Sequence, residues 1–347
     1  MNKVIFVCLA VCMIGIPLFC QNNNILNTNQ KYSFIESDSL TGSNLSDFTF
    51  DRNGILWVVS TKYYPSTKPN PFSNFPMIWF VSKIEDNKYY TIKDSLEVKI
   101  KNIVFDKFNT LHILCIKQII TLNNESKFVP FFVSSEIGGF NSLAFDNNNN
   151  IWVGGLQTGI LMYDGNTWST YNTENSSLPT NSSTNIFIDN NNIKWLTLWE
   201  KKGILKIEDN QWTYFTKEDS DFLNNQFWSI TVDLDNNLWI GTGWLQSPVK
   251  VVEYNGNKWF INNPTNVDGK SISGTIRTLI TDIEGNIWSV SSISRKRSCV
   301  GSILSKYDGN NWQNIEIDDV NIIRDIEIDK NGNIWILSQN RIIQVTE

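Results

Sequence analysis

The sequence predicts an all-β fold, a single seven-bladed β-propeller of four-stranded blades over residues 31–347. The first observation is a motif that occurs seven times: an Asp, a Gly or Asn three residues later, and a Trp or His six residues later. Its copies begin 40 to 55 residues apart, the length of one propeller blade. The second is that residues before each Asp alternate in polarity, as in a strand. The copies start at Asp51, Asp106, Asp146, Asp189, Asp233, Asp282 and Asp329.

Each Asp is expected to open a tight turn between the first two strands of a blade. Only Gly and Asn occupy the third position after it, and these residues tolerate the left-handed backbone conformation. A second motif, such as Tyr163-Asp-Gly-Asn-Thr-Trp168, predicts the turn between the third and fourth strands. The last copy lacks one strand, because only Arg341 to Thr346 can form a strand after Trp335. We expect Lys31 to Ser37 to supply it, so that the two ends of the chain close the ring and leave no free sheet edge.

The amino terminus predicts a signal peptide over residues 1–20. Lys3 precedes an apolar run from Val4 to Phe19, which is shorter than the roughly 20 residues of a transmembrane helix. Residues 21–30 are expected to be a flexible segment. These features predict a secreted or periplasmic protein without a membrane span. A lipoprotein acylated at Cys20 is a less favoured alternative, because Phe19 stands where a small residue is needed. An uncleaved anchor is another less favoured alternative.

Composition narrows the classes of function. The net charge is −6, from 29 basic and 35 acidic residues, which argues against a nucleic-acid partner. The single His excludes a His-rich metal site. The Asp- and Asn-rich turns lack the Gly and Glu of a calcium-binding loop, so neither a metal nor a cofactor is expected. His112 is expected to replace a core Trp, with a role as general base as the alternative.

Binding is expected on the face opposite the Asp turns, where the loops vary in length, because binding residues gather on loops over a rigid scaffold. Trp79, Trp199, Trp228 and Trp244 lie outside both motifs and are expected in or beside these loops. Aromatic and basic side chains suit a carbohydrate or another small polar ligand, and equally a protein interface. The candidate ligand-binding residues are Tyr63, Tyr64, Trp199, Trp228, Trp244, Arg277 and Arg324.

The residue four positions before each Asp is small and polar in all seven copies, so the entrance to the propeller tunnel is expected to be hydrophilic. Three of the candidate residues, Trp228, Arg277 and Arg324, lie one position earlier and are expected near this entrance. The small polar set is Asp47, Asn102, Ser142, Asn185, Ser229, Thr278 and Asp325.

The two motifs resemble the two-component regulator propeller repeat, over roughly residues 31–347. The resemblance implies export and a binding role, because well-known members are periplasmic sensor propellers thought to recognise oligosaccharides. Those sensors carry a transmembrane helix and a kinase, whereas this chain is expected to be one propeller without either. It is also distantly similar to the propeller lyases that cleave streptogramins with a His and metal help, but His112 does not match the placement of that His.

We therefore expect an exported, non-enzymatic module that recognises a ligand or a protein, with oligosaccharides as a candidate ligand. One alternative is a lyase or hydrolase similar to the streptogramin lyases. Another is a scaffold protein of the cell envelope. The sequence does not indicate an oligomeric state.

Overall fold

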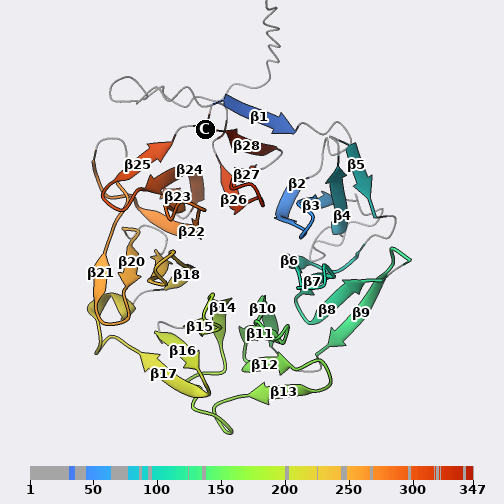
Figure 1. Ribbon diagram of the computed structural model, residues 1–347, viewed down its shortest axis with the longest axis horizontal. Coiled ribbons are helices and arrows are strands. Elements are labelled where there is room, and N and C mark those ends of the chain that lie inside the picture. Colours follow the sequence, from blue (N-terminus) through green and yellow to red (C-terminus); the bar gives the residue numbers. More distant parts are fainter. Residues whose placement is uncertain are drawn as a thin grey trace, which may run out of the picture.

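The computed structural model is a closed ring of seven four-stranded antiparallel sheets (Figure 1). The predicted seven-bladed propeller is therefore confirmed. The structure describes residues 31–35, 44–63, 77–85, 88–92, 96–123, 125–134, 138–199, 203–224, 226–243, 248–265, 269–295, 298–315, 317, 320, 322–338 and 341–346. The predicted signal peptide and flexible segment lie outside these residues.

In the first four blades, the strands follow one another outward from the centre of the ring in chain order. Blade 1 holds β2 (Asn44–Phe50), β3 (Leu56–Tyr63), β4 (Met77–Glu85) and β5 (Lys88–Thr91). Blade 2 holds β6 (Ile100–Phe105), β7 (Leu111–Cys115), β8 (Gln118–Leu122) and β9 (Phe128–Val133). Blade 3 holds β10 (Gly139–Phe145), β11 (Ile151–Leu156), β12 (Ile160–Tyr163) and β13 (Trp168–Tyr171). Blade 4 holds β14 (Ser183–Ile188), β15 (Lys194–Leu198), β16 (Ile204–Glu208) and β17 (Gln211–Phe215).

The last three blades are built in the same way, except that the seventh combines both ends of the chain. Blade 5 follows the short 3-10 helix η2 (Asp221–Asn224) and holds β18 (Phe227–Val232), β19 (Leu238–Thr242), β20 (Val251–Tyr254) and β21 (Trp259–Ile261). Blade 6 holds β22 (Gly274–Thr281), β23 (Ile287–Arg295), β24 (Ser298–Tyr307) and β25 (Trp312–Ile315). Blade 7 holds β26 (Ile323–Ile328), β27 (Ile334–Ser338), β28 (Ile342–Thr346) and β1 (Lys31–Ile35). Within the described residues, no helix is long and apolar enough to cross a membrane.

The N-terminal strand closes the ring as predicted. Strand β1 pairs antiparallel with β28, from Lys31 opposite Thr346 to Ile35 opposite Ile342. It forms the outer edge of blade 7, in the order β1-β28-β27-β26, and Figure 1 shows it beside the last strands of the chain. The first and last residues of the propeller are therefore held together in one sheet.

The Asp turns explain why the sequence motif repeats. In each turn, one carboxylate oxygen of the Asp accepts hydrogen bonds from the backbone N–H groups two and four residues later, as Asp282 does from Glu284 and Asn286. The other oxygen accepts the indole N–H of the Trp in six blades, at 2.8 to 3.4 Å. The Gly or Asn between them has φ between 62° and 89° in all seven turns, which confirms the predicted left-handed position.

Gly and Asn at this position join neighbouring blades in two different ways on the turn face, the face of the ring that carries the Asp turns. At three of the four Asn positions, the side-chain oxygen accepts the backbone N–H of the preceding blade's turn, as Asn109 does from Arg52 at 2.8 Å. Where it is Gly, a long side chain of the preceding turn lies over it. A Cβ on Gly332 would come within 2.4 Å of the Ile283 side chain. The choice between the two residues therefore depends on the neighbouring blade.

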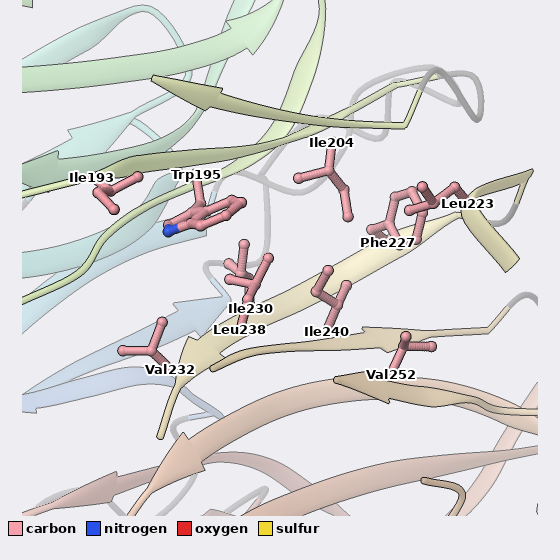
Figure 2. Close-up of a cluster of buried hydrophobic side chains, with 10 residues drawn as sticks. All are labelled: Ile193, Trp195, Ile204, Leu223, Phe227, Ile230, Val232, Leu238, Ile240 and Val252. Atoms are coloured by element: carbon pink, nitrogen blue, oxygen red, sulfur yellow. The ribbon is translucent and has the colours of Figure 1, made fainter. Parts of the chain in front are cut away.

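The hydrophobic core lies between the blades, where one sheet packs on the next. Between blades 4 and 5, Trp195 and Ile204 pack against Phe227, Ile230 and other apolar side chains (Figure 2). The Trp of each turn motif is thus held from two sides, by its Asp and by the apolar face of a sheet.

Candidate functional site

A β-bulge occurs at the same place in the innermost strand of all seven blades. In each case the register between the first and second strands skips one residue, as at Ser46 between Leu45 and Asp47. A bulge adds a residue to one strand and redirects its side chain, and bulges are enriched beside functional sites. We call this place the bulge position; it lies toward the face opposite the Asp turns, the loop face. Its residues are Ser46, Lys101, Asn141, Thr184, Trp228, Arg277 and Arg324.

Six of the seven side chains at the bulge position are hydrogen-bonded to protein atoms near the loop face. Lys101 donates to the Asn141 side chain at 2.6 Å, and Arg324 donates to the carbonyl of Leu45 across the junction between blades 7 and 1. The Trp228 indole N–H donates to the Gly243 carbonyl at 2.7 Å. The remaining three bonds run from Ser46 to Val59, from Asn141 to Ser183, and from Thr184 to Phe227.

Arg277 is the exception among the bulge residues. Its side chain is exposed, and among the described residues we find no hydrogen bond from its guanidinium group. Its charge lies near Asp325 and holds the pKa of that carboxyl lower than burial alone would. Of the seven equivalent positions, this one leaves a set of strong donors open to solvent.

The next residue of each strand, which we call the belt position, joins the blades further. It comprises the small polar set predicted from the sequence, and its members form four hydrogen bonds across junctions between blades. Asp47 accepts the backbone N–H of Ile103, and Thr278 donates to Asp325 at 2.8 Å. In the other two bonds, the Ser142 hydroxyl donates to the Asn185 side chain, and the Ser229 hydroxyl accepts the backbone N–H of Leu279. Together with the bulge residues, these bonds span all seven junctions, so this end of the ring is a rigid scaffold.

Three carboxyl groups gather at the junction between blades 7 and 1. Burial raises the pKa of Asp325 to about 6, against opposing hydrogen bonds from Thr278 and Ile326. Burial and the charge of Asp325 raise the pKa of Asp47 well above its ordinary value. Burial and the charges of both Asp residues do the same for Glu327. Burial is the largest cause of all three raised pKa values, and repulsion between the carboxylates adds to it for Asp47 and Glu327. Ring closure brings these groups together.

The aromatic candidates are only partly described. Trp199 is half-buried in the connection between β15 and β16, where its backbone N–H donates to the Ser182 carbonyl at 3.0 Å. Tyr63 ends β3 on the same face, beside Met77 of β4. Tyr64 and Trp244 lie outside the described residues. Trp199, Trp228, Arg277 and Arg324 therefore come from four consecutive blades, 4 to 7, at the loop face.

Trp79 corrects one expectation from the sequence. It was grouped with the loop tryptophans, but it lies in β4 and is only 5% exposed. It packs with Val59, Val81 and Ile100 in the core between blades 1 and 2. It therefore belongs to the core and has no place in a binding surface.

His112 is a buried core residue, as its place in the motif indicated. It is 4% exposed, and its ring packs edge-on against Phe131 and Phe145. Its Nε2 lies 3.5 Å from an Asp106 oxygen, but neither ring nitrogen has a hydrogen-bond partner within the described structure. Burial lowers the pKa of the imidazole, against the opposing charge of Asp106. The ring is therefore neutral and shielded from solvent.

We expect the His112→Phe variant to resist acid better than the native protein. The folded protein holds this imidazole with a lowered pKa, so only the unfolded chain takes up its proton as the pH falls below about 6.5. The native protein thus loses stability there, relative to the variant. Urea unfolding of both proteins at about pH 7.5 and about pH 5 measures the effect. A difference in unfolding free energy that does not change with pH would contradict a buried neutral imidazole.

Sequence reasoning did not single out several residues of this region, among them Lys101, Asn141 and Glu327. Lys101 and Asn141 share the bulge position with the predicted residues, and an alignment of the seven repeats at that column would have found them. Glu327 lies two residues before its Asp, where the other six copies have uncharged residues. Within the described residues, no group of three or more His, Cys, Asp or Glu side chains is arranged to hold a metal ion.

Comparison with known proteins shows the propeller fold. No protein-family model and no curated protein matches this sequence. Virginiamycin B lyase from Staphylococcus aureus, as a histidine-to-alanine variant described as catalytically inactive with quinupristin, is similar at a TM-score of 0.67 and 12% identity over 92% of this chain and all of that one. An extracellular domain of a hybrid two-component system from B. thetaiotaomicron is similar at 0.66 and 18%, over 92% of this chain and 41% of that one. PorZ, a surface component of the type-IX secretion system of Porphyromonas gingivalis, follows at 0.57 and 15%, over 86% and 46%.

Proposed function

We propose that this protein is an exported recognition module that binds an oligosaccharide or a similar polar ligand at the centre of its loop face. The observation that carries the proposal is the repeated bulge, which places seven side chains around the ring at one level. Six of them are bonded to the scaffold, and Arg277 is exposed. The similarity to extracellular sensor propellers supports export and recognition as the general role.

The chemistry of this surface suits a polar ligand with flat apolar faces. Trp199 and Trp228 are both partly exposed, on the neighbouring blades 4 and 5. An indole ring offers a flat apolar surface together with one donor. Arg277, on the next blade, supplies hydrogen-bond donors in a planar array. A sugar ring needs both kinds of contact, a stacking surface and directed hydrogen bonds.

A lyase activity has less support. The similarity to virginiamycin B lyase is one of fold, at 12% identity, and fold alone does not carry a reaction. The single His of this chain is buried between two Phe rings with a lowered pKa. A histidine-dependent reaction on the loop face would need an imidazole that a substrate can reach.

We expect oligosaccharide binding to raise the melting temperature of the native protein, because a ligand that binds only the folded state stabilises it. Thermal-shift screening against neutral and acidic oligosaccharides identifies the ligand. The Trp199→Ala variant should weaken the binding at least about ten-fold, the effect of about 1.4 kcal/mol, because it removes a stacking surface.

The matched control is Phe108→Ala, which removes an aromatic side chain that is 72% exposed on the turn face. This variant should bind as the native protein does. If no oligosaccharide stabilises the native protein, the proposed function is wrong. If Phe108→Ala rather than Trp199→Ala abolishes binding, the ligand binds on the turn face and the proposed site is wrong.

A further inference from the structure

We propose that Arg277 binds an anionic group of the ligand, a carboxylate or sulfate on a saccharide, and that the ligand binds together with a proton taken up by the carboxyl groups beneath it. The inference deepens the proposed function and rests on it. It follows from three features of the ring centre: a free guanidinium group, an excess of cations at the bulge position, and a cluster of carboxyl groups one residue further along the strands.

The first step is the difference between Arg277 and the residues equivalent to it. The fold provides seven similar positions, and at six of them the side chain is hydrogen-bonded to protein atoms. Arg has more donors than the other five residue types found at these positions. Arg324 is bonded, whereas Arg277 is exposed and forms no such bond among the described residues. A guanidinium group stays charged at any physiological pH and fits a carboxylate or sulfate with two parallel hydrogen bonds.

The second step is the charge of the bulge position as a whole. It carries three cations, Lys101, Arg277 and Arg324, and no acidic residue. The bulge position is therefore positively charged, whereas the chain as a whole has a net charge of −6. Burial and the nearby charge of Lys99 lower the pKa of Lys101. The three cations favour the approach of an anion to this end of the ring.

The third step concerns the carboxyl groups beneath Arg277. Asp325 is hydrogen-bonded to Thr278, the residue that follows Arg277 in β22. The charged groups around Asp325 are Arg277 from β22, Asp47 from β2 and Glu327 from its own strand. Arg324, the neighbour of Asp325 in β26, is bonded to the Leu45 carbonyl. The charge of Arg277 lowers the pKa of Asp325, in addition to the hydrogen bonds from Thr278 and Ile326.

An anion on Arg277 neutralises this charge. The ionised carboxyl groups then lose the stabilisation that the Arg277 charge gives them, and they take up a proton more readily. By linkage, the protonated cluster binds the anion more tightly than the ionised cluster does. Binding of an acidic saccharide should therefore be tighter at about pH 5.5 than at about pH 8, by about five-fold or more, the usual lower limit for coupled sites.

The experiment is isothermal titration calorimetry of the native protein at these two pH values. The probes are trigalacturonate, a chondroitin sulfate tetrasaccharide, uncharged cellotriose and inorganic sulfate. The native protein should bind an acidic oligosaccharide more tightly than cellotriose, and more tightly at the lower pH. If inorganic sulfate binds with the same affinity as the acidic oligosaccharides, the ligand is the free anion rather than a saccharide. That result would overturn the saccharide part of the inference.

Three variants separate the possible outcomes. Arg277→Gln should weaken binding of the acidic oligosaccharide at least about ten-fold. Lys107→Gln removes an exposed cation from the turn face and is the matched control, so it should bind as the native protein does. Asp325→Asn should reduce the pH dependence and retain binding, since the amide oxygen can still accept the hydrogen bond from Thr278.

Two results would overturn the inference and leave the proposed function intact: cellotriose binding as tightly as the acidic probes, or full binding of the acidic probes by Arg277→Gln. Binding of an acidic oligosaccharide with equal affinity at both pH values would overturn the proton linkage. Failure of every saccharide to bind would overturn the inference together with the proposed function.

Discussion

A protein that lacks residues 22–40 is expected to be much less stable and less soluble than the native chain. The deletion removes β1, whose five residues pair with β28 along the outer edge of blade 7. The hydrogen bonds lost, at about 0.5–1.5 kcal/mol each, amount to about 3 kcal/mol or more of unfolding free energy. For a chain of this size, that corresponds to a fall of roughly 4 °C or more in melting temperature. The uncovered edge of β28 is also free to pair with other chains.

Differential scanning calorimetry and size-exclusion chromatography measure this outcome. The control is a deletion of residues 22–30, which keeps β1 and should leave both the melting temperature and the elution volume as in the native protein. If the protein without residues 22–40 melts at the native temperature and stays monodisperse, ring closure by β1 does not contribute to stability.

The second large effect is expected for Trp288→Ala. Trp288 is 1% exposed, and its indole N–H donates to Asp282 at 2.8 Å. Its ring packs with Ile323 and Ile336 of blade 7, and the Lys306 ammonium lies 5.3 Å from its centre. Truncation of such a side chain leaves a cavity and typically costs about 3–5 kcal/mol of unfolding free energy. Urea unfolding of the native protein and the variant gives the difference in unfolding free energy, provided that the dependence on urea concentration has the same slope for both.

Trp288→Phe is the companion variant, because it keeps most of the apolar volume and removes the indole donor. The Asn286 side chain still donates to the same Asp282 oxygen at 2.8 Å, so we expect a smaller loss of about 1–2 kcal/mol. Equal losses for Phe and Ala would show that the hydrogen bond, rather than packing, dominates at this position. A loss below about 1 kcal/mol for Ala would contradict the role of this Trp in the core.

Much of the architecture could be predicted because each blade depends on short-range chemistry that the sequence repeats. Asp282, Gly285 and Trp288 lie within seven residues of one another, and the turn they form needs no other part of the chain. The same spacing in seven copies predicted the number of blades, and the incomplete last copy predicted the closing strand. Trp79 was assigned wrongly because it belongs to no repeated motif, so only its neighbours in space could place it in the core.

The candidate site was predicted in part, since Arg277 and Trp228 were named from their distance to the Asp of their blades. The sequence could not show that Arg324 and Trp228 are hydrogen-bonded to backbone carbonyls while Arg277 is exposed. Those bonds depend on atoms of other strands and, for Arg324, of the neighbouring blade, whose distances no local pattern contains.

The sequence by itself therefore determined the blade, the number of blades and the face on which the chain varies, because turns and strands are encoded by residues close together along the chain. Only the tertiary structure decided which of seven equivalent side chains is exposed and forms no hydrogen bond among the described residues. The tertiary structure also brings Asp47 close to Asp325 and Glu327, although almost 280 residues separate Asp47 from this pair along the chain. These groups meet because β1 closes the ring, and closure creates a junction whose two sides are far apart in the sequence.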